Sequence, residues 1–389
     1  MKKWFFLCLV SLCPLFSRAG EECRVTSRDI AEGVTEYSLS NGIFEIKCVP
    51  ETSGMISGLN SLPDNREMIR PLECTVDKDD LLPPRCHTNL TGFRELVRGV
   101  KMSVHTEYSP QTPACTVDSV ELVMTGRGFY LWNIDAVKRI TLRKGESGAK
   151  ITLTLTAASD ILSPICLWIN GIAYMGKTER DTVLMPVRNI SEMRLGLAMA
   201  AFPEEGVFLD RELNPQNISA AAGAPWIART SPEEPGVLVM RLDKNFAESG
   251  VLYTWKQGTS SIHTTEAIYG PVTLKKGESK EITAEYLYFA ELTGLLDIAG
   301  PYGLDRKGNV IEIASAAPVP AGIMTLNWHD ASGRSGDLGD FSLPALIPGQ
   351  IAKIDLSGRN MPEKCTIGGT LPGGLKFNLP GLVEKITGQ

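Results

Sequence analysis

"RITLRKGESGAKITLTLT", from Arg139 to Thr156, is the stretch that decides the fold class of this chain. Within it Ile151, Leu153 and Leu155 alternate with threonines, and this period of two places the three aliphatic side chains on one face of a strand. Gly145 lies between that strand and an earlier alternating segment, and glycine supplies the positive φ that a tight reversal needs. We therefore expect two antiparallel strands joined by a short turn.

Nearly the same turn sequence occurs twice in the chain. "LRKGES" spans Leu142 to Ser147, and "LKKGES" returns from Leu274 to Ser279 inside the alternating segment "PVTLKKGESKEITAEYLYF". A looser version lies in "LIPGQIAKIDLS", from Leu346 to Ser357. Each copy joins two strand-like segments, and its polar residues keep the turn in water. We therefore interpret the hexapeptide as architecture rather than chemistry.

Alternation continues along most of the chain. "PICLWIN" places its aliphatic residues on one side of a strand and Trp168 and Asn170 on the other. "GVLYTWK" likewise gathers Tyr253 and Trp255 on one side. Only Ser191 to Phe202 keeps a pattern that also fits a helix, so its secondary structure is left open. The chain is predicted to be all-β.

The N-terminus has the parts of a secretory signal peptide. A lysine-led start is followed by an apolar run from Trp4 to Phe16 and then by Ser17-Arg18-Ala19, with small residues at the positions that signal peptidase inspects. We expect residues 1–19 to be removed, which predicts a secreted or periplasmic protein. The apolar run is shorter than the roughly 20 residues that a spanning helix needs, so no membrane insertion is expected.

The remaining residues are predicted to form two domains. Residues 20–296 are expected to form a large antiparallel β-sandwich, and residues 297–389 a small immunoglobulin-like sandwich. The boundary lies near "TGLLDIAGPYGLDRKGN", where strand pattern gives way to glycine and proline. Beyond it, "NVIEIAS", "GIMTLNW", "IAKIDLS" and "GLKFNLP" follow one another as short strand-like segments.

Charge and cysteine content narrow the classes of partner. The net charge of −6 becomes about −9 when Lys2, Lys3 and Arg18 leave with the signal peptide, and an acidic surface argues against nucleic acid. Nine cysteines become seven, which leaves at least one free thiol. Cys74 and Cys86 flank "CTVDKDDLLPPRC" and are the pair expected to be bonded. The cysteine spacing fits no zinc site, and that acidic loop lacks the glycine of an EF-hand, so no metal is expected.

Two stretches resemble a known superfamily. "YSLSNGIFEIKCVPETSGMISGLN" (Tyr37 to Asn60) resembles the opening of galactose-mutarotase-like domains, with a strand, Asn-Gly, a second strand and a glycine-containing segment. "HTTEAIYGPVTLKKGESKEITAEYLYFAELTGL" (His263 to Leu295) looks like the closing part of such a domain. The resemblance implies a large antiparallel sandwich, a supersandwich whose concave face holds a sugar.

The resemblance also implies an acid and a base, a histidine and a glutamate, on opposite sides of the sugar. Glu266 lies where relatives keep their base, near the end of the large domain. His263 and His105 are the candidate histidines. His105 lies on the polar face of an alternating, strand-like segment. On a regular strand His263 and Glu266 would face opposite sides, because they are three residues apart.

Binding without chemistry needs aromatic rings for the C–H faces of a sugar and polar groups for its hydroxyls. The residues expected to bind are Trp168, Asn170, Tyr253, Trp255, Gln257 and Arg94, with Glu95 and Arg98 at the rim. In the alternative interpretation, the tryptophans fill the core or the junction between domains.

The leading hypothesis is an exported carbohydrate-binding protein that uses no cofactor. One alternative is an aldose 1-epimerase-like or other sugar-active enzyme with a Glu/His pair, and another is a structural or adhesive envelope protein. The chain has no Gly-x-Ser-x-Gly elbow, phosphate loop or dinucleotide fingerprint. The predicted partner is a saccharide.

Overall fold

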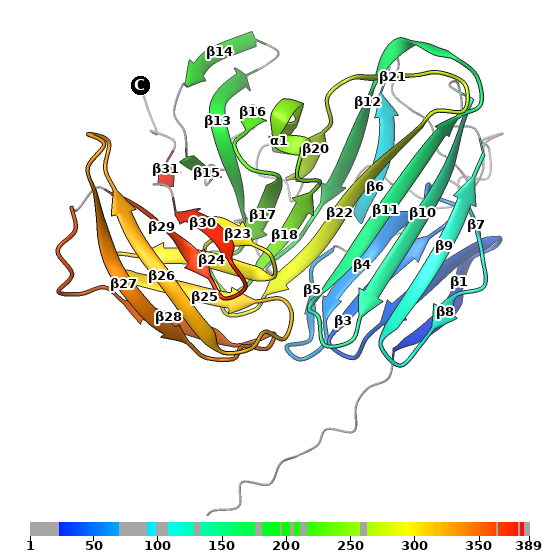
Figure 1. The fold of residues 1–389 in the computed structure, drawn as a ribbon. Helices are drawn as coiled ribbons and strands as arrows, with labels where there is room; N and C mark the ends of the chain where they lie inside the picture. The colour runs from blue at the N-terminus through cyan, green and yellow to red at the C-terminus, as the bar shows by residue number, and fades with distance from the viewer. Residues whose placement is uncertain are drawn as a thin grey trace, which may run out of the picture.

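The structure is a computed structural model, and it describes residues 23–69, 92–98, 108–127, 133–175, 181–194, 197–202, 206–210, 216–256, 263–362, 365–379 and 382–384. The expected signal peptide lies outside these residues. Backbone pairing joins 23 strands into one continuous sheet that folds into two layers, and the chain is all-β as predicted (Figure 1). Within the described ranges the only α-helix is α1 (Phe246–Ser249), and no helix there is long and apolar enough to cross a membrane.

The two layers are named here after their central strands. The β12 layer contains, in order, β1 (Arg24–Ala31), β2 (Val34–Ser40), β3 (Phe44–Val49), β4 (Met55–Ser61), β6 (Gly92–Arg98), β12 (Ile161–Ile172), β20 (Glu266–Ile268), β19 (Val251–Lys256) and β16 (Gln216–Ala222), with β5 (Arg66–Glu67) beside β4 and β21 (Val272–Leu274) beside β12. The β11 layer contains β7 (Tyr108–Pro110) and β8 (Ala114–Cys115) beside β9 (Ser119–Gly126), then β10 (Ile134–Arg143), β11 (Gly148–Ala157), β22 (Ser279–Phe289), β18 (Val237–Leu242) and β17 (Trp226–Thr230).

One long strand joins the layers. β13 (Thr182–Arg194) pairs with β17 through its first residues and with β16 through its later ones. β14 (Leu197–Phe202) and β15 (Gly206–Asp210) also pair with β13, so the described residues of the segment whose secondary structure was left open are extended rather than helical. The layers are therefore continuous at the β13 side. At the other side, β1 ends the β12 layer, and β8 and β9 end the β11 layer.

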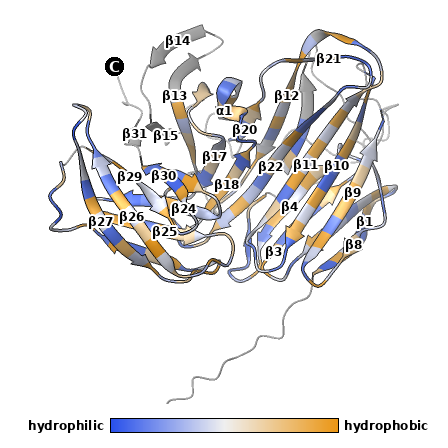
Figure 2. Cartoon of the chain, in the orientation of Figure 1, coloured by the Kyte–Doolittle hydropathy of each residue, from blue (hydrophilic) through white to orange (hydrophobic). Residues whose placement is uncertain are grey.

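Alternation of side chains builds the core between the layers. Every second residue of β10 and β11 is buried, and Figure 2 shows the matching exchange of hydrophobic and hydrophilic residues along both strands. The buried set in β11 includes Ile151, Leu153 and Leu155, as the sequence predicted. Removing one such aliphatic side chain from water is worth about 1.5–3 kcal/mol, so the pattern fixes which face of each strand turns inward.

Both copies of the hexapeptide form the predicted turn. Gly145 and Gly277 have φ of 78° and 82°, and in each copy the following glutamate N–H donates to a carbonyl three residues earlier. A glycine with positive φ at the third position is what a type II turn requires. The looser copy has the same geometry, since Gly349 has φ of 85° and Gln350 N donates to the Ile347 carbonyl.

The two close copies have different surroundings. In the first, Ser147 N donates to the Ala316 carbonyl at 2.7 Å, and a Cβ added to Gly145 would lie 3.2 Å from Pro318. In the second, a Cβ on Gly277 would meet nothing within 4 Å. The same six residues therefore serve once as a junction with the C-terminal strands and once as an exposed turn.

The C-terminal strands form two antiparallel sheets of four. One contains β23 (Asp297–Ala299), β24 (Tyr302–Lys307), β25 (Val310–Ser315) and β28 (Ile351–Asp355); the other contains β27 (Ser335–Leu343), β26 (Gly322–His329), β29 (Thr366–Leu371) and β30 (Leu375–Leu379). All four predicted short segments are strands. The two sheets share one core, here called the small sandwich, and that core continues into Trp226 and Phe289 of the β11 layer. β31 (Leu382–Glu384) then pairs in parallel with β15. The immunoglobulin-like topology and the boundary at residue 297 stay predictions.

Candidate functional site

A row of predicted site residues crosses the β12 layer. Arg94 of β6 lies opposite Asn170 of β12, and Tyr253 of β19 lies opposite Glu266 of β20. The pairing of β12 with β20, extended by one residue, sets Asn170 beside Glu266. Directly opposed residues of antiparallel strands point to the same side of a sheet. The aliphatic residues that alternate with Asn170 on β12 fill the core, so these four residues face away from it.

This side of the layer is called the β12 outer face and is defined by Arg94, Trp168, Asn170, Tyr253 and Glu266. Trp168 lies two residues before Asn170 and therefore shares its side. Its ring centroid is 6.2 Å from that of Tyr253, and the two planes meet at 88°. Both rings are half-buried. Together they form a right-angled aromatic corner.

The outer face also carries two buried groups of opposite charge. Arg94 is 8% exposed and Glu266 is 1% exposed. Burial lowers the pKa of the Arg94 guanidinium, and the nearby Glu266 carboxylate opposes this shift because its negative charge favours the cation. Charges held away from water need partners. A guanidinium donates hydrogen bonds and a carboxylate accepts them, so the β12 outer face carries groups of both kinds.

A second buried ion pair supports the segment that leads to Glu266. Arg229 of β17 is 3% exposed, and its guanidinium donates to the His263 carbonyl and to Asp181 Oδ2, the latter at 3.4 Å. Asp181 also accepts the Met175 N–H at 2.6 Å. Burial raises the pKa of Asp181, while Arg229 acts in the opposite direction. The carbonyl that Arg229 holds is three residues from Glu266.

The sequence analysis missed this pair. The sequence held a signal, because "WIART" places an arginine among mostly apolar residues, and the structure buries all five. The partner, 48 residues earlier, could not be chosen without the pairing of β13 with β17.

The remaining predicted residues fall into three groups. His263 is buried, with 2% exposed, and Trp255 is half-buried two residues beyond Tyr253. His105 and Gln257 lie outside the described residues, as do the Cys74–Cys86 pair and the side chain of Arg98. Their predicted roles stay predictions.

The prediction for Glu95 is wrong. Glu95 was placed at the rim beside Arg94, but it lies opposite Ile169, whose side chain is in the core. It is 6% exposed and accepts a hydrogen bond from Lys138 Nζ at 2.6 Å. Successive residues of a strand point to opposite faces, so Arg94 and Glu95 cannot share a rim.

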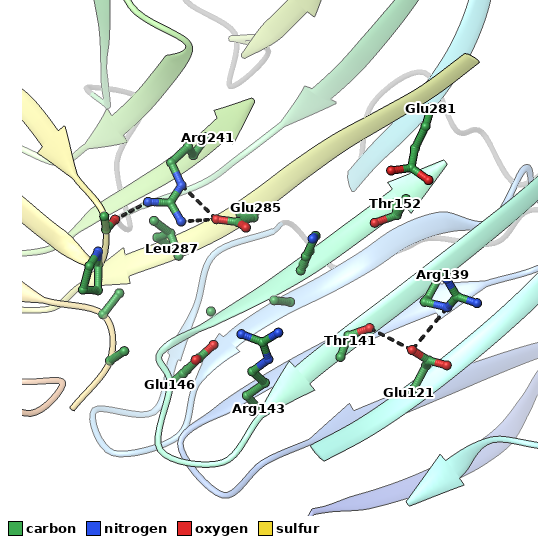
Figure 3. A pocket seen from close by; sticks show the side chains of 17 residues that line it. Glu121, Arg139, Thr141, Arg143, Glu146, Thr152, Arg241, Glu281, Glu285 and Leu287 are labelled. Carbon is green, nitrogen blue, oxygen red and sulfur yellow. Dashed lines mark hydrogen bonds and ion pairs between the residues drawn. The ribbon is translucent and has the colours of Figure 1, made fainter. Parts of the chain in front are cut away.

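A charged cavity of about 530 Å³ lies on the other layer, where the small sandwich meets β11 and β22 (Figure 3). Two ion pairs lie within it: Arg139 is 3.2 Å from Glu121, and Arg241 donates to Glu285 and also to the Gly300 carbonyl. None of the described residues that line it is aromatic. It therefore lacks the apolar ring faces that a pyranose prefers.

A further cavity, of about 580 Å³, lies where Pro348 and Gly349 of the small sandwich approach the large one. Here Arg66 donates to the Tyr288 hydroxyl at 3.1 Å, and that hydroxyl donates to Asp64 at 2.7 Å. Burial raises the pKa of Tyr288, as does its bond to Asp64. These groups satisfy one another, which is typical of a structural junction.

No group of three or more His, Cys, Asp or Glu suited to a metal ion occurs in the part of the chain that the structure describes. The candidate site is therefore described by its hydrogen-bonding and aromatic groups alone.

No protein-family model matches the chain, and no curated protein matches it in sequence. Solved structures do match its fold. A galactose mutarotase-like protein from Clostridium acetobutylicum aligns with 69% of this chain and 99% of its own, at 11% identity and a TM-score of 0.54. A TPR-domain containing protein from Parabacteroides distasonis aligns with 68% of this chain and 48% of its own, at 11% identity and a TM-score of 0.52. The fold is therefore galactose-mutarotase-like, as the sequence resemblance implied.

Proposed function

We propose that this chain is an exported protein that binds a saccharide on the β12 outer face. The observation that carries the proposal is convergence: four residues predicted from sequence to bind a sugar, and the glutamate predicted as a catalytic base, come from four different strands and lie on one side of one sheet layer. Of the two cavities beside the small sandwich, one is lined by no aromatic residue among those described, and the other has a single tyrosine whose hydroxyl is bonded to Arg66 and Asp64. The fold alone would not choose between functions, because one fold hosts many.

The aromatic corner and the charged row suggest how the ligand would lie. One ring of the Trp168–Tyr253 corner would support the C–H face of a pyranose. Asn170 and Arg94 would donate to hydroxyl oxygens, and Glu266 would accept hydroxyl protons. A hydroxyl bonded to a charged group is worth about 1.5–3 kcal/mol, so the Arg94–Glu266 pair would contribute much of the specificity.

A second candidate, an aldose 1-epimerase-like enzyme, would use the same face. What favours it is Glu266, which is almost completely buried beside a guanidinium on the outer face of a mutarotase-like sheet. Mutarotation needs a base at the anomeric hydroxyl and an acid at the ring oxygen. Glu266 would be the base, with His263 or His105 as the acid.

A glycan-array screen of the purified protein, followed by calorimetry on each hit, tests binding. We expect Trp168→Ala to weaken affinity about tenfold or more, since one aromatic contact and its buried area are lost. Glu281→Gln removes one carboxylate from the exposed side of the other layer and is the matched control. It should leave affinity unchanged.

An anomerisation assay on each bound sugar separates the two candidates. Catalysis that Glu266→Gln abolishes, while binding persists, would favour the enzyme. Binding without anomerisation would favour a binding protein. If the wild-type protein binds no glycan, both are refuted and a structural or adhesive role is left.

A further inference from the structure

Two cysteines lie close together at the side of the large sandwich where, among the described strands, no backbone pairing joins the layers. Cys23 precedes β1, the last strand of the β12 layer, and Cys115 ends β8 at the edge of the β11 layer. Figure 1 shows β1 and β8 beside each other at this edge. Both thiols are reduced in the structure.

The two cysteines are in direct contact. Cys115 Sγ donates to the Cys23 carbonyl oxygen at 2.7 Å. That oxygen is two bonds from the Cys23 Cα, with lengths of about 1.5 and 1.2 Å, so Cys115 Sγ is no more than about 5.5 Å from that Cα. Cys115 also raises the pKa of the Cys23 thiol electrostatically, as expected of two sulfur atoms that lie near each other.

The surroundings of the two thiols differ, and the difference determines which thiol reacts first. Cys115 is exposed, whereas Cys23 is 7% exposed and belongs to the margin of the core. Burial raises the pKa of the Cys23 thiol, and the nearby Lys144 charge opposes this shift. An exposed thiol meets an external oxidant first, so Cys115 is the sulfur that reacts with it.

We propose that Cys23 and Cys115 form a disulfide bond that ties β1 of one layer to β8 of the other. The oxidant is a small-molecule or protein disulfide. The Cys115 thiolate attacks it, forms a mixed disulfide and releases one thiol; the Cys23 thiolate then attacks Cys115 Sγ and releases the second. Two protons leave the protein, and the two electrons reduce the external disulfide to two thiols.

The bond would close the one side of the sandwich that β13 does not hold. The partners are 92 residues apart, and the loop between them contains β1 to β7 and hence Arg94. A crosslink across so long a loop removes much of the conformational freedom of the unfolded chain. It would also fasten the first strand of the layer, which otherwise pairs only with β2 in the described part of the sheet.

The test is peptide mapping of the purified protein after equilibration with oxidised and reduced glutathione. Remaining thiols are alkylated in denaturant, the protein is digested without reductant, and peptides are identified by mass spectrometry. We expect a linked pair of peptides containing Cys23 and Cys115. Recovery of both as alkylated peptides under the oxidising condition, or of either linked to another cysteine, would overturn the proposal.

Thermal unfolding gives a second, independent readout. Reduction should lower the melting midpoint of the oxidised wild-type protein by several degrees. Cys115→Ser should reduce this dependence on reductant to the part that any other bond, such as the predicted Cys74–Cys86 pair, contributes, and Cys365→Ser, which changes a half-buried thiol in the small sandwich, should keep all of it. If the Cys115→Ser midpoint still falls on reduction as far as that of the wild type, the bond lies elsewhere and the proposal fails.

Discussion

Lys138 offers the sharpest test of how the large sandwich is held together. Its side chain is completely buried between the layers, and its Nζ donates to Glu95 Oε2 and to the Gly54 carbonyl, both at 2.6 Å. Lys138→Met keeps the unbranched side chain as far as its fourth heavy atom and removes the cation. The carboxylate of Glu95 and one backbone carbonyl then remain buried without their donor.

The size of the loss follows from these two contacts. Removing one partner of a buried ion pair costs about 3–5 kcal/mol, because the other charge remains buried without a partner. In the double variant Lys138→Met/Glu95→Leu no charge is left, and only the Gly54 carbonyl remains unpaired, at about 1–3 kcal/mol. We therefore expect the double variant to be more stable than either single variant.

Unfolding in guanidinium chloride, followed by circular dichroism, measures these free energies of unfolding. Variants are compared when their m-values are equal. Arg139→Met is the matched control: Arg139 is the next residue, points outward, is 50% exposed and pairs with Glu121 at 3.2 Å. It should change stability by no more than about 1 kcal/mol. The reasoning is refuted if Lys138→Met costs no more than this control, or if the double variant loses the sum of the two single losses.

Three further predictions concern pH, turns and hydroxyl groups. Burial raises the pKa of Asp297 in the folded protein to about 6, which is above its pKa in the unfolded chain. The stability that protonated Asp297 contributes is fully present below about pH 4. It is lost as the pH rises through 6. The unfolding free energy of Asp297→Asn, relative to wild type, should rise by about 3 kcal/mol between pH 4 and pH 7, and a constant difference would contradict this. Gly277→Ala should cost about 1–2 kcal/mol through its positive φ alone. Gly145→Ala should cost more because it presses on the small sandwich, and equal melting midpoints would refute that junction. The Tyr286 hydroxyl is buried with no hydrogen-bond partner among the described residues, so Tyr286→Phe should be neutral or stabilising. Tyr288→Phe loses two bonds and should cost about 1–3 kcal/mol in denaturant unfolding, and the reverse order would count against both assignments.

Local pattern predicted the strands and turns because both depend on neighbouring residues. The alternation around Ile151 and the glycine at position 145 were sufficient for that hairpin. The same alternation contains the signal for Lys138, which falls in phase with Ile134 and Ile140 on the apolar face of its strand. Its partner could not be predicted, because Glu95 is 43 residues away and meets it only across the two layers.

The sequence predicted which types of residue form the candidate site but did not predict how they are arranged, for a related reason. Trp168 and Tyr253 are 85 positions apart in the sequence, and their contact depends on the insertion of β20 between β12 and β19. No periodicity within either strand specifies that order. The composition of each strand therefore named candidates, and only the sheet order decided which of them meet.

Strand β6 couples the proposed site to the core. Arg94 faces the proposed ligand, while Glu95, the next residue, is fixed by Lys138 across the sandwich. Because side chains on one strand move with a common backbone, losing the buried pair should shift Arg94 as well as lower stability. Weakened saccharide binding in Lys138→Met would therefore not make Lys138 a ligand contact. If Lys138→Met/Glu95→Leu regains stability and also regains affinity, the core pair acts by positioning Arg94; if stability returns while affinity stays low, the coupling through β6 is refuted.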